Sequence, residues 1–268
     1  MKGECVQLDS DKGCWKPSSQ IFFSQGKHDS TDKEASYASN HFYLPYRFRD
    51  PLFSPSFDTE ISICYDKYDL VLESRDAMNN LTTVGTQDRS PTAALQSSGY
   101  DYLVLKPTLI MDTNLNRTAC SYENLGILTA TATKGKPEET RGDLLIGFEP
   151  FMTEKQKAAY LENPLEGGPP VFGEASIRIV YDDLAYYRTK FSQNPLPTAT
   201  ASITWETHVA DLAAGEQSKL QHSFLYRDGF GGEIQTKGQA EPCKGSAKPR
   251  WIASGWTMFN NKGDPVKK

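Results

Sequence analysis

The stretch DTNLNRTACSYE carries side-chain oxygens at the spacing of a calcium-binding loop. Asp112, Asn114 and Asn116 occupy its first, third and fifth positions. Glu123 occupies the twelfth, as in an EF-hand. An EF-hand also needs a glycine at its sixth position and a helix on each side, but Arg117 stands at the sixth position and both flanking segments resemble strands. We therefore expect Asp112, Asn114 and Asn116 to cap a turn with their side chains.

His208, in the segment TWETHVADL, has two carboxylates close to it in sequence. Glu206 and Asp211 are candidates for an acid that orients a histidine base, and Glu206 would share a strand face with His208. No serine or cysteine nucleophile is marked by a motif, and a partly exposed polar face explains the segment equally well. A hydrolase centred on His208 thus remains a hypothesis that loss of activity in His208→Ala would support.

Other residues with chemical potential lack the context that their chemistry needs. The sequence GFGG is followed by a strand-like segment, whereas a dinucleotide fingerprint opens a helix. Asp182 and Asp183 are adjacent, so in a strand they point to opposite faces. The histidines and cysteines are too few and too scattered for a metal site; the cysteines are Cys5, Cys14, Cys64, Cys120 and Cys243. The sequence predicts no catalytic, cofactor-binding or metal-binding residue, and hence no enzyme.

Composition restricts the classes of partner. The 268 residues carry a net charge of −5, and no run of Lys and Arg forms a basic patch. Nucleic acid is therefore an unfavourable partner. No apolar run reaches the roughly 18 residues of a membrane-spanning helix, and the first residues lack the apolar region of a secretion signal.

Two segments predict short helices. In TDKEASYASN, Thr31 and Glu34 have the spacing of a capping box, and the helix would run to Asn40. In TEKQKAAYLENP, Thr153 and Gln156 have the same spacing, which predicts a helix over 154–162. Residues 85–100 and 163–172 are rich in Gly, Pro and Ser and are expected to be loops.

Most other segments are short, rich in β-branched and aromatic residues, and bounded by turn residues. The predicted class is all-β and mostly antiparallel, with one or two short helices. An aromatic residue followed by a polar turn recurs at Tyr65, Tyr122, Tyr181, Tyr226 and Phe259. These repeats predict hairpins near 61–77, 118–134, 177–190, 221–238 and 251–268. A glycine four residues after the aromatic is replaced in three repeats, by Asp69, Ala185 and Phe230, where we expect irregular turns.

This hairpin pattern resembles the YD repeats of Rhs proteins. A series of ordered blocks is similar to the C-terminal shell region of the B component of insecticidal toxin complexes (Tc toxins). They include HFYLPYRFRDP, YDKYDLVLESRDAMNN, YLVLKPTLIMDTNLNRTACSYENLGILTATATKGKP, IRIVYDDL, QHSFLYRDGFGGEIQTKGQAEP and RWIASGWTMFNNKGDPVKK. The resemblance covers nearly the whole chain. It implies that residues 1–268 are a single β-rich fragment of a larger shell, with residues 1–50 as a separate edge segment.

In that family the B and C components build a hollow β-sheet cocoon around a toxic part of the C component. The region resembled here is wall, so no catalytic residue is carried over. The resemblance implies a virulence-associated protein, secreted as part of a toxin complex. Its partners would be the remaining B-component repeats and the C component, without membrane contact by this segment.

A second hypothesis is a secreted YD-type binding module for carbohydrate or a partner protein. It would use exposed aromatic side chains, with Trp205, Trp251 and Trp256 as candidates. Ordinary packing of these tryptophans on a sheet is the competing interpretation.

Overall fold

The computed structural model describes residues 19–267 except 52, 55, 57, 86–98, 140–141, 209–210, 214–215, 217 and 246–248. Cys5, Cys14 and most of the loop predicted over 85–100 lie outside the described residues. The chain divides into two compact units between Arg117 and Thr118, and each unit is described by itself.

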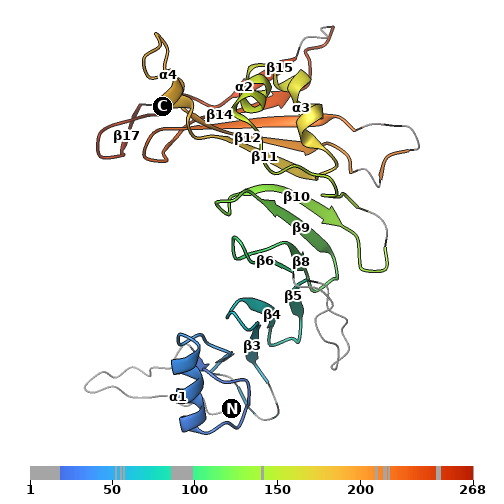
Figure 1. Ribbon diagram of the computed structural model, residues 1–268, viewed down its shortest axis with the longest axis vertical. Helices are drawn as coiled ribbons and strands as arrows, with labels where there is room; N and C mark the ends of the chain where they lie inside the picture. Colours follow the sequence, from blue (N-terminus) through green and yellow to red (C-terminus); the bar gives the residue numbers. More distant parts are fainter. Residues whose placement is uncertain are drawn as a thin grey trace. The chain divides into compact units, whose positions relative to one another are not determined.

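The first unit is an antiparallel sheet with a helix, α1 (Thr31–Asn40) (Figure 1). Its strand order is β1-β2-β3-β4-β5-β8, and β6 and β7 form a separate antiparallel pair. The strands are β1 (Gln20–Phe22), β2 (Arg47–Arg49), β3 (Glu60–Tyr65), β4 (Val71–Arg75), β5 (Leu81–Val84), β6 (Tyr100–Asp101), β7 (Lys106–Pro107) and β8 (Leu109–Met111).

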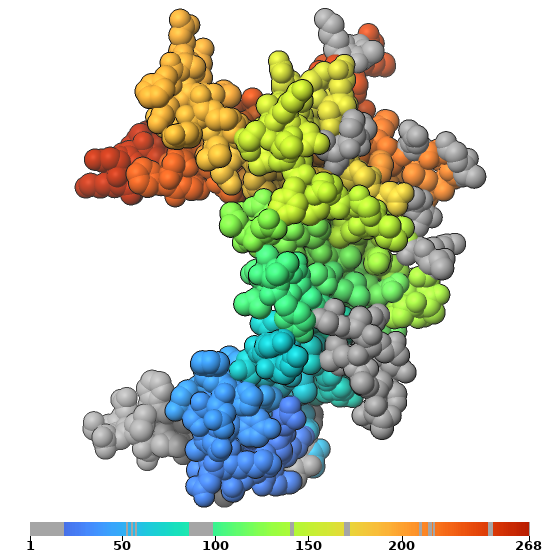
Figure 2. All heavy atoms as spheres, viewed as in Figure 1, coloured from blue at the N-terminus to red at the C-terminus, as the bar shows by residue number. Residues whose placement is uncertain are grey.

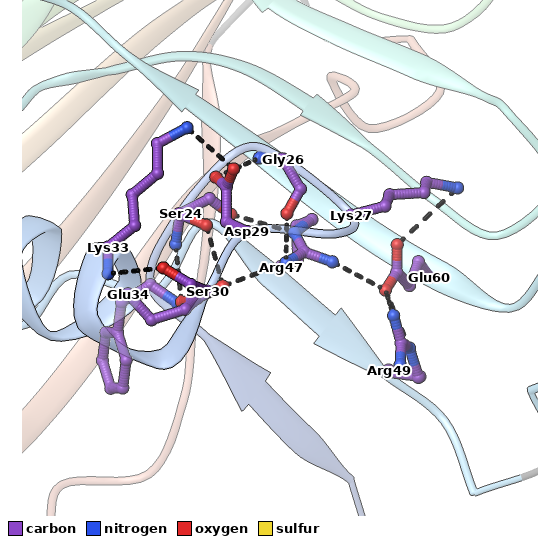
Figure 3. A network of polar contacts seen from close by, with 11 residues as sticks. Ser24, Gly26, Lys27, Asp29, Ser30, Lys33, Glu34, Arg47, Arg49 and Glu60 are labelled. Atoms are coloured by element: carbon purple, nitrogen blue, oxygen red, sulfur yellow. Dashed lines mark hydrogen bonds and ion pairs between the residues drawn. The ribbon is translucent and has the colours of Figure 1, made fainter.

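A buried ion network takes the place of a large apolar core in the first unit. Among its described residues, the fully buried apolar side chains are Ala38, Tyr46 and Met111. The Arg47 side chain is 4% exposed and donates from Nη1 to Glu60 Oε1 at 3.0 Å and from Nη2 to Glu34 Oε1 at 3.1 Å (Figure 3). Buried charges are tolerated when they are paired and hydrogen-bonded, as here.

Backbone carbonyl oxygens complete this network. Arg47 also donates from Nε to the Ser24 carbonyl and from Nη2 to the Gly26 carbonyl, each at 2.9 Å. Glu60 Oε1 accepts a second charged donor, Arg49 Nε, at 2.8 Å. The network therefore ties the segment that follows β1 to β2 and β3.

The N-cap of helix α1 lies one residue before the residue that the sequence suggests. Ser30 is the N-cap, and its side chain accepts the N–H of Lys33. Glu34 does not complete a capping box. Its carboxylate instead accepts the backbone N–H groups of Phe23 and Ser24, because the ion network draws it towards β1.

The second unit has the strand order β9-β10-β11-β12-β13-β14-β15, with a separate antiparallel pair β16-β17. Its strands are β9 (Arg117–Tyr122), β10 (Leu128–Lys134), β11 (Ile177–Asp182), β12 (Thr198–Trp205), β13 (Leu220–Arg227), β14 (Glu233–Ala240), β15 (Arg250–Ala253), β16 (Met258–Phe259) and β17 (Pro265–Lys267). Its helices are α2 (Glu154–Glu162), α3 (Pro164–Phe172) and α4 (Ala185–Thr189).

The core of the second unit lies between this sheet and helices α2 and α3 (Figure 1). Alternate residues of β12 are buried, including Ala201 and Ile203, as expected for a strand with one covered face. Tyr160 of α2 and Phe172 of α3 pack on this face, together with Phe224 of β13. Helix α2 has the predicted bounds and the predicted capping box between Thr153 and Gln156.

Helix α3 replaces the loop expected over 163–172, so that prediction was wrong. Gly and Pro disfavour a helix intrinsically, but Pro164 occupies the first turn, where proline is tolerated. A Cβ atom on Gly168 would lie 2.4 Å from Cε1 of His222, and one on Gly167 would lie 2.9 Å from Cα of Tyr160. The two glycines therefore allow α3 to pack closely on β13 and α2, and this packing outweighs their low propensity.

A five-residue turn recurs throughout the described sheet. The first residue accepts, through its side-chain oxygen, the N–H groups of the third and fifth residues. The N–H of the fourth residue donates to the first carbonyl, and the fourth residue has positive φ. Five described turns share this geometry; they begin at Asp66, Asp76, Asp112, Asp228 and Asn260.

Two of the turns expected to be irregular are regular. Asp69 adopts φ +61° at the fourth position, in place of glycine. Phe230 does not occupy that position, because this turn begins at Asp228, two residues after Tyr226, and Gly231 supplies the positive φ of +86°. Glu123 begins a turn with the same backbone bonds, closed by Gly126 at φ +74°.

The segment 177–190 is not a hairpin, contrary to the repeat pattern. Strand β11 is followed by α4, and its antiparallel partner is β12. Both oxygens of Asp182 accept Arg188 Nη2 at 2.7 Å, so this carboxylate does not cap a turn. The segment around α4 stands out from the surface (Figure 2). Phe191, which follows α4, is exposed.

The all-β, mostly antiparallel class is confirmed, with four short helices among the described residues where one or two were expected. None of these helices is long and apolar enough to cross a membrane.

Removing the charge of Glu60 should destabilise the first unit severely. In Glu60→Gln the guanidinium of Arg47 keeps its burial but loses a charged partner, which costs about 3–5 kcal/mol. Urea unfolding followed by circular dichroism measures the loss. Lys33→Gln removes an exposed ion pair with Asp29 and should leave the midpoint nearly unchanged. Equal effects of the two variants would contradict a structural role for the buried network.

The second unit should lose stability as pH falls below neutrality because of His222. Burial lowers the pKa of His222 below its ordinary value of 6.5. The unfolded chain then binds the proton first, so the contribution to the free energy of unfolding is complete above pH 6.5 and declines below it. His222→Gln should reduce this pH dependence in urea titrations between pH 5 and 8, whereas His28→Gln, at an exposed position, should not. Identical pH slopes in wild type and His222→Gln would disprove this contribution of His222.

Candidate functional site

The turn at Asp112 uses the residues that have calcium-ligand spacing. Asp112 Oδ1 accepts the backbone N–H groups of Asn114 and Asn116, both at 2.8 Å. Asp112 Oδ2 accepts the side-chain N–H of Asn116 at 3.0 Å. Partial burial opposes ionisation of Asp112, but the hydrogen bonds from Asn116 and Asn114 outweigh it and hold the pKa of this carboxyl below its usual value. Glu123 is separated from this turn by strand β9, whose six residues extend about 20 Å.

His208 contacts an acid that the sequence did not indicate. Its Nδ1 lies 2.9 Å from Oδ2 of Asp143, whereas Asp211 contributes only a backbone N–H to the carbonyl of His208. Asp143 is 1% exposed, and the hydroxyl of Ser176 donates to the same oxygen. The sequence analysis missed Asp143 because it lies 65 residues from His208.

The order of this cluster differs from a catalytic triad. In a triad the histidine stands between the serine and the acid and removes the serine proton. Here Asp143 stands between Ser176 and His208, and the oxygen of Ser176 accepts the N–H of Thr133 at 2.7 Å. The cluster therefore joins two connections of the second sheet, the one between β10 and β11 and the one between β12 and β13, and Ser176 contacts the carboxylate instead of the histidine.

His222 and His41 contact the core and a turn, respectively. His222 Nδ1 lies 3.1 Å from the Tyr160 hydroxyl in the core. His41 Nδ1 lies 2.7 Å from Asp69 Oδ1 and stacks on Tyr37, with ring centroids 5.3 Å apart. Among the residues that the structure describes, no three His, Cys, Asp or Glu side chains gather as metal ligands.

Two of the three candidate binding tryptophans are packed on the sheet. Trp205 lies edge-on to Phe172, with centroids 4.8 Å apart, and Trp251 lies 5.5 Å from Phe224. Both contact the core of the second unit. Trp256 is 50% exposed and is the one of the three available to a ligand.

The thiols that the structure describes are weak candidates for chemistry. Cys64 and Cys120 are half-buried, and burial raises the pKa of each thiol, which disfavours the reactive thiolate. Cys243 is exposed.

Calcium should not bind the Asp112 loop. Isothermal titration with calcium should show no binding tighter than millimolar, because the Asp112 oxygens are held by the loop's own N–H groups. Asp112→Ala should cost about 1 kcal/mol by removing these turn hydrogen bonds, with or without calcium. Asn114→Ala removes a presumptive ligand but no turn bond, so it should be nearly neutral. A micromolar site lost in both variants would restore the calcium interpretation.

No protein-family model and no curated protein matches this chain. Solved structures do match it. A crystal structure of TcdB2-TccC3 aligns with 92% of the chain at a TM-score of 0.57 and 17% identity. TcdB2-TccC3-TEV aligns with 92% of the chain at a TM-score of 0.57 and 16% identity. TcdB2-TccC3 without its hypervariable C-terminal region aligns with 98% of the chain at a TM-score of 0.56 and 14% identity.

At such identities the likeness establishes the fold alone, and the chain spans 13% to 16% of the length of these matched chains. The matched region extends over nearly the whole chain, as the resemblance to the B component implies. The chain therefore has the fold of a segment of the Tc-toxin shell represented by TcdB2-TccC3.

Proposed function

We propose that this chain is a non-enzymatic wall segment of a Tc-toxin-like cocoon that encloses a toxic cargo. The observation that carries the proposal is the fold likeness to TcdB2-TccC3 over 92% of the chain. In this role the chain is secreted as part of a toxin complex. Its partners are the remaining B-component repeats and the C component.

The sheet is built in a way that suits a wall. Within each unit, most strands that follow one another in the chain are antiparallel neighbours, apart from the separate pairs β6-β7 and β16-β17, and five-residue turns join several of them. A sheet of this kind grows by adding hairpins at its edge, without any change to the strands already placed. The groups with chemical potential support the same role, since His208 and Asp143 tether connections and Asp112 caps a turn.

Strand β15 offers a place for such growth. It is the last strand in the hydrogen-bonded order of the second unit, so its outer edge lies next to no further described strand. Unpaired backbone groups at an edge favour pairing with another strand. Ile252 on β15 is 59% exposed, which adds apolar surface at this edge.

Assembly and protection of cargo test the proposal. The full chain would be tagged and produced together with the polypeptides encoded beside its gene, then fractionated by size and challenged with protease. We expect it to elute in a large assembly whose cargo resists protease until the assembly is unfolded. Ile252→Lys should lower incorporation, because a charged edge strand pairs poorly.

Val266→Lys is the matched control, since Val266 is similarly exposed but lies on β17 in the separate strand pair. It should incorporate like wild type. A monodisperse monomer that melts cooperatively and joins no assembly would overturn the proposal.

The alternative, a binding module, rests on the exposed ring of Trp256. A glycan array separates the two functions, because a wall segment should give no specific hits. Specific binding that Trp256→Ala abolishes would favour the module.

A further inference from the structure

Arg178 places a buried positive charge on β11 of the second unit. Its side chain points to the covered face of the sheet, and the residue is 4% exposed. Its guanidinium lies 4.3 Å from the ring centroid of Phe148. Nη1 donates to the carbonyl oxygen of Glu149 at 2.8 Å, whereas Nε is buried and has no hydrogen-bond partner.

No described carboxylate compensates this charge at ion-pair distance. Burial lowers the pKa of Arg178 to about 10, with a smaller opposing effect from the charge of Glu149, so the group stays protonated near neutrality. The Glu149 carboxylate is directed elsewhere, and its Oε1 accepts the N–H of Phe151 at 3.0 Å. A buried charge without a partner is costly, and proteins usually pair it.

The contrast with Arg47 shows what is missing. Arg47 is equally buried in the first unit, but it donates to two carboxylates and two carbonyl oxygens. Arg178 has one such acceptor, a neutral carbonyl. The unmatched guanidinium therefore has capacity for an anionic oxygen.

A cavity of about 150 Å³ adjoins this guanidinium. Its lining consists of Gly147, Phe148, Glu149, Phe151, Met152, Gln156, Gly173 and Arg178. One water molecule needs roughly 10–15 Å³ of such space, so the cavity has room for a small polar group. The walls carry polar as well as apolar surface, and a hydrogen bond to the charged guanidinium is stronger than one between neutral groups.

Gln156 supplies a second donor at the cavity. Its Oε1 accepts the backbone N–H of Thr153 at 2.8 Å as part of the capping box. This contact fixes which end of the amide faces the cap and leaves the Nε2 hydrogens for another acceptor. The cavity thus combines one charged planar donor with one neutral donor.

We propose that this cavity binds a carboxylate, through Arg178 and Gln156. A planar guanidinium matches the two oxygens of a carboxylate, and the space fits a group of that size. The carboxylate comes either from a free small acid or from the side chain or C-terminus of a polypeptide. The site does not depend on a role in a cocoon wall.

Acetate is the first probe, added to the full chain at constant ionic strength with chloride as the reference. The readout is the NMR signal of the Arg178 Nε–H group, assigned by its loss in Arg178→Met. We expect a saturable shift with acetate and none with acetamide, its neutral analogue. The thermal unfolding midpoint should rise with acetate over the same concentration range.

Two variants separate binding from folding. Gln156→Glu preserves the capping box but places a negative charge at the cavity, so it should weaken acetate binding about tenfold while the chain stays folded. Arg178→Met should abolish the rise in the unfolding midpoint. Arg227→Met, at an exposed position of β13, should leave it unchanged.

Short peptides identify the source of the carboxylate. Acetyl-Ala-Glu-Ala-amide is compared with its Gln counterpart, and acetyl-Ala-Ala-Ala with its amide. Stronger binding of either acid than of its neutral counterpart assigns the site to a polypeptide, and binding of acetate alone assigns it to a small acid. No response of the Arg178 signal to any of the acids, or full acetate binding by Gln156→Glu, would overturn the proposal.

Discussion

The hairpins depend on one acceptor oxygen at the start of each turn. In the turn at Asp76, Oδ1 accepts the N–H groups of Met78 and Asn80, two donors that the reversal takes out of the strand ladder. The fourth residue, Asn79, must take φ +65°, which costs a non-glycine residue about 1–2 kcal/mol. Each hydrogen bond returns about 1 kcal/mol net, so the set of turn bonds offsets that strain. The chain can therefore reverse within five residues even where glycine is absent.

Such local reversals determine the topology of each unit. A strand that ends in a five-residue turn has only one place for the next strand, which is beside it and antiparallel. In the second unit the order β11-β12-β13-β14-β15 also follows the chain, although of these strands the Asp228 turn joins only β13 and β14, and a helix or a longer connection joins the others. Helices α2 and α3 then need only cover the face that carries Val180, Ile203 and Phe224. The first unit has fewer buried apolar residues and relies on Arg47 and its carboxylates instead.

Sequence patterns predicted the features whose causes are local. Helix α2 follows from Thr153 and Gln156, which lie within its first turn and form the capping box directly. The turn at Asp112 follows from side chains that bond to their own loop. Its recurrence at Asp76 was missed, because Arg75 rather than an aromatic residue precedes that turn.

Features that depend on distant residues were not predictable in this way. Helix α3 forms because Gly168 fits against His222, which lies far along the chain. Asp143 meets His208 only after β11 and β12 have paired, so neither residue's surroundings in sequence indicate the contact. The same holds for Arg178, because only the folded structure shows that no described carboxylate lies at ion-pair distance from its guanidinium.

The polar groups around Asp143 show how connections are held together in the second unit. Successive connections of an antiparallel sheet lie at alternate ends, so every second connection lies at the same end. Asp143 and Ser176 lie in the connection between β10 and β11, and His208 lies in the connection between β12 and β13, so two connections meet at the same end of the second sheet. That is where a catalytic group would assemble, yet the shared acceptor is the buried Asp143, and both donors are spent on it. The convergence of these connections is used here to hold them in place through one buried carboxylate.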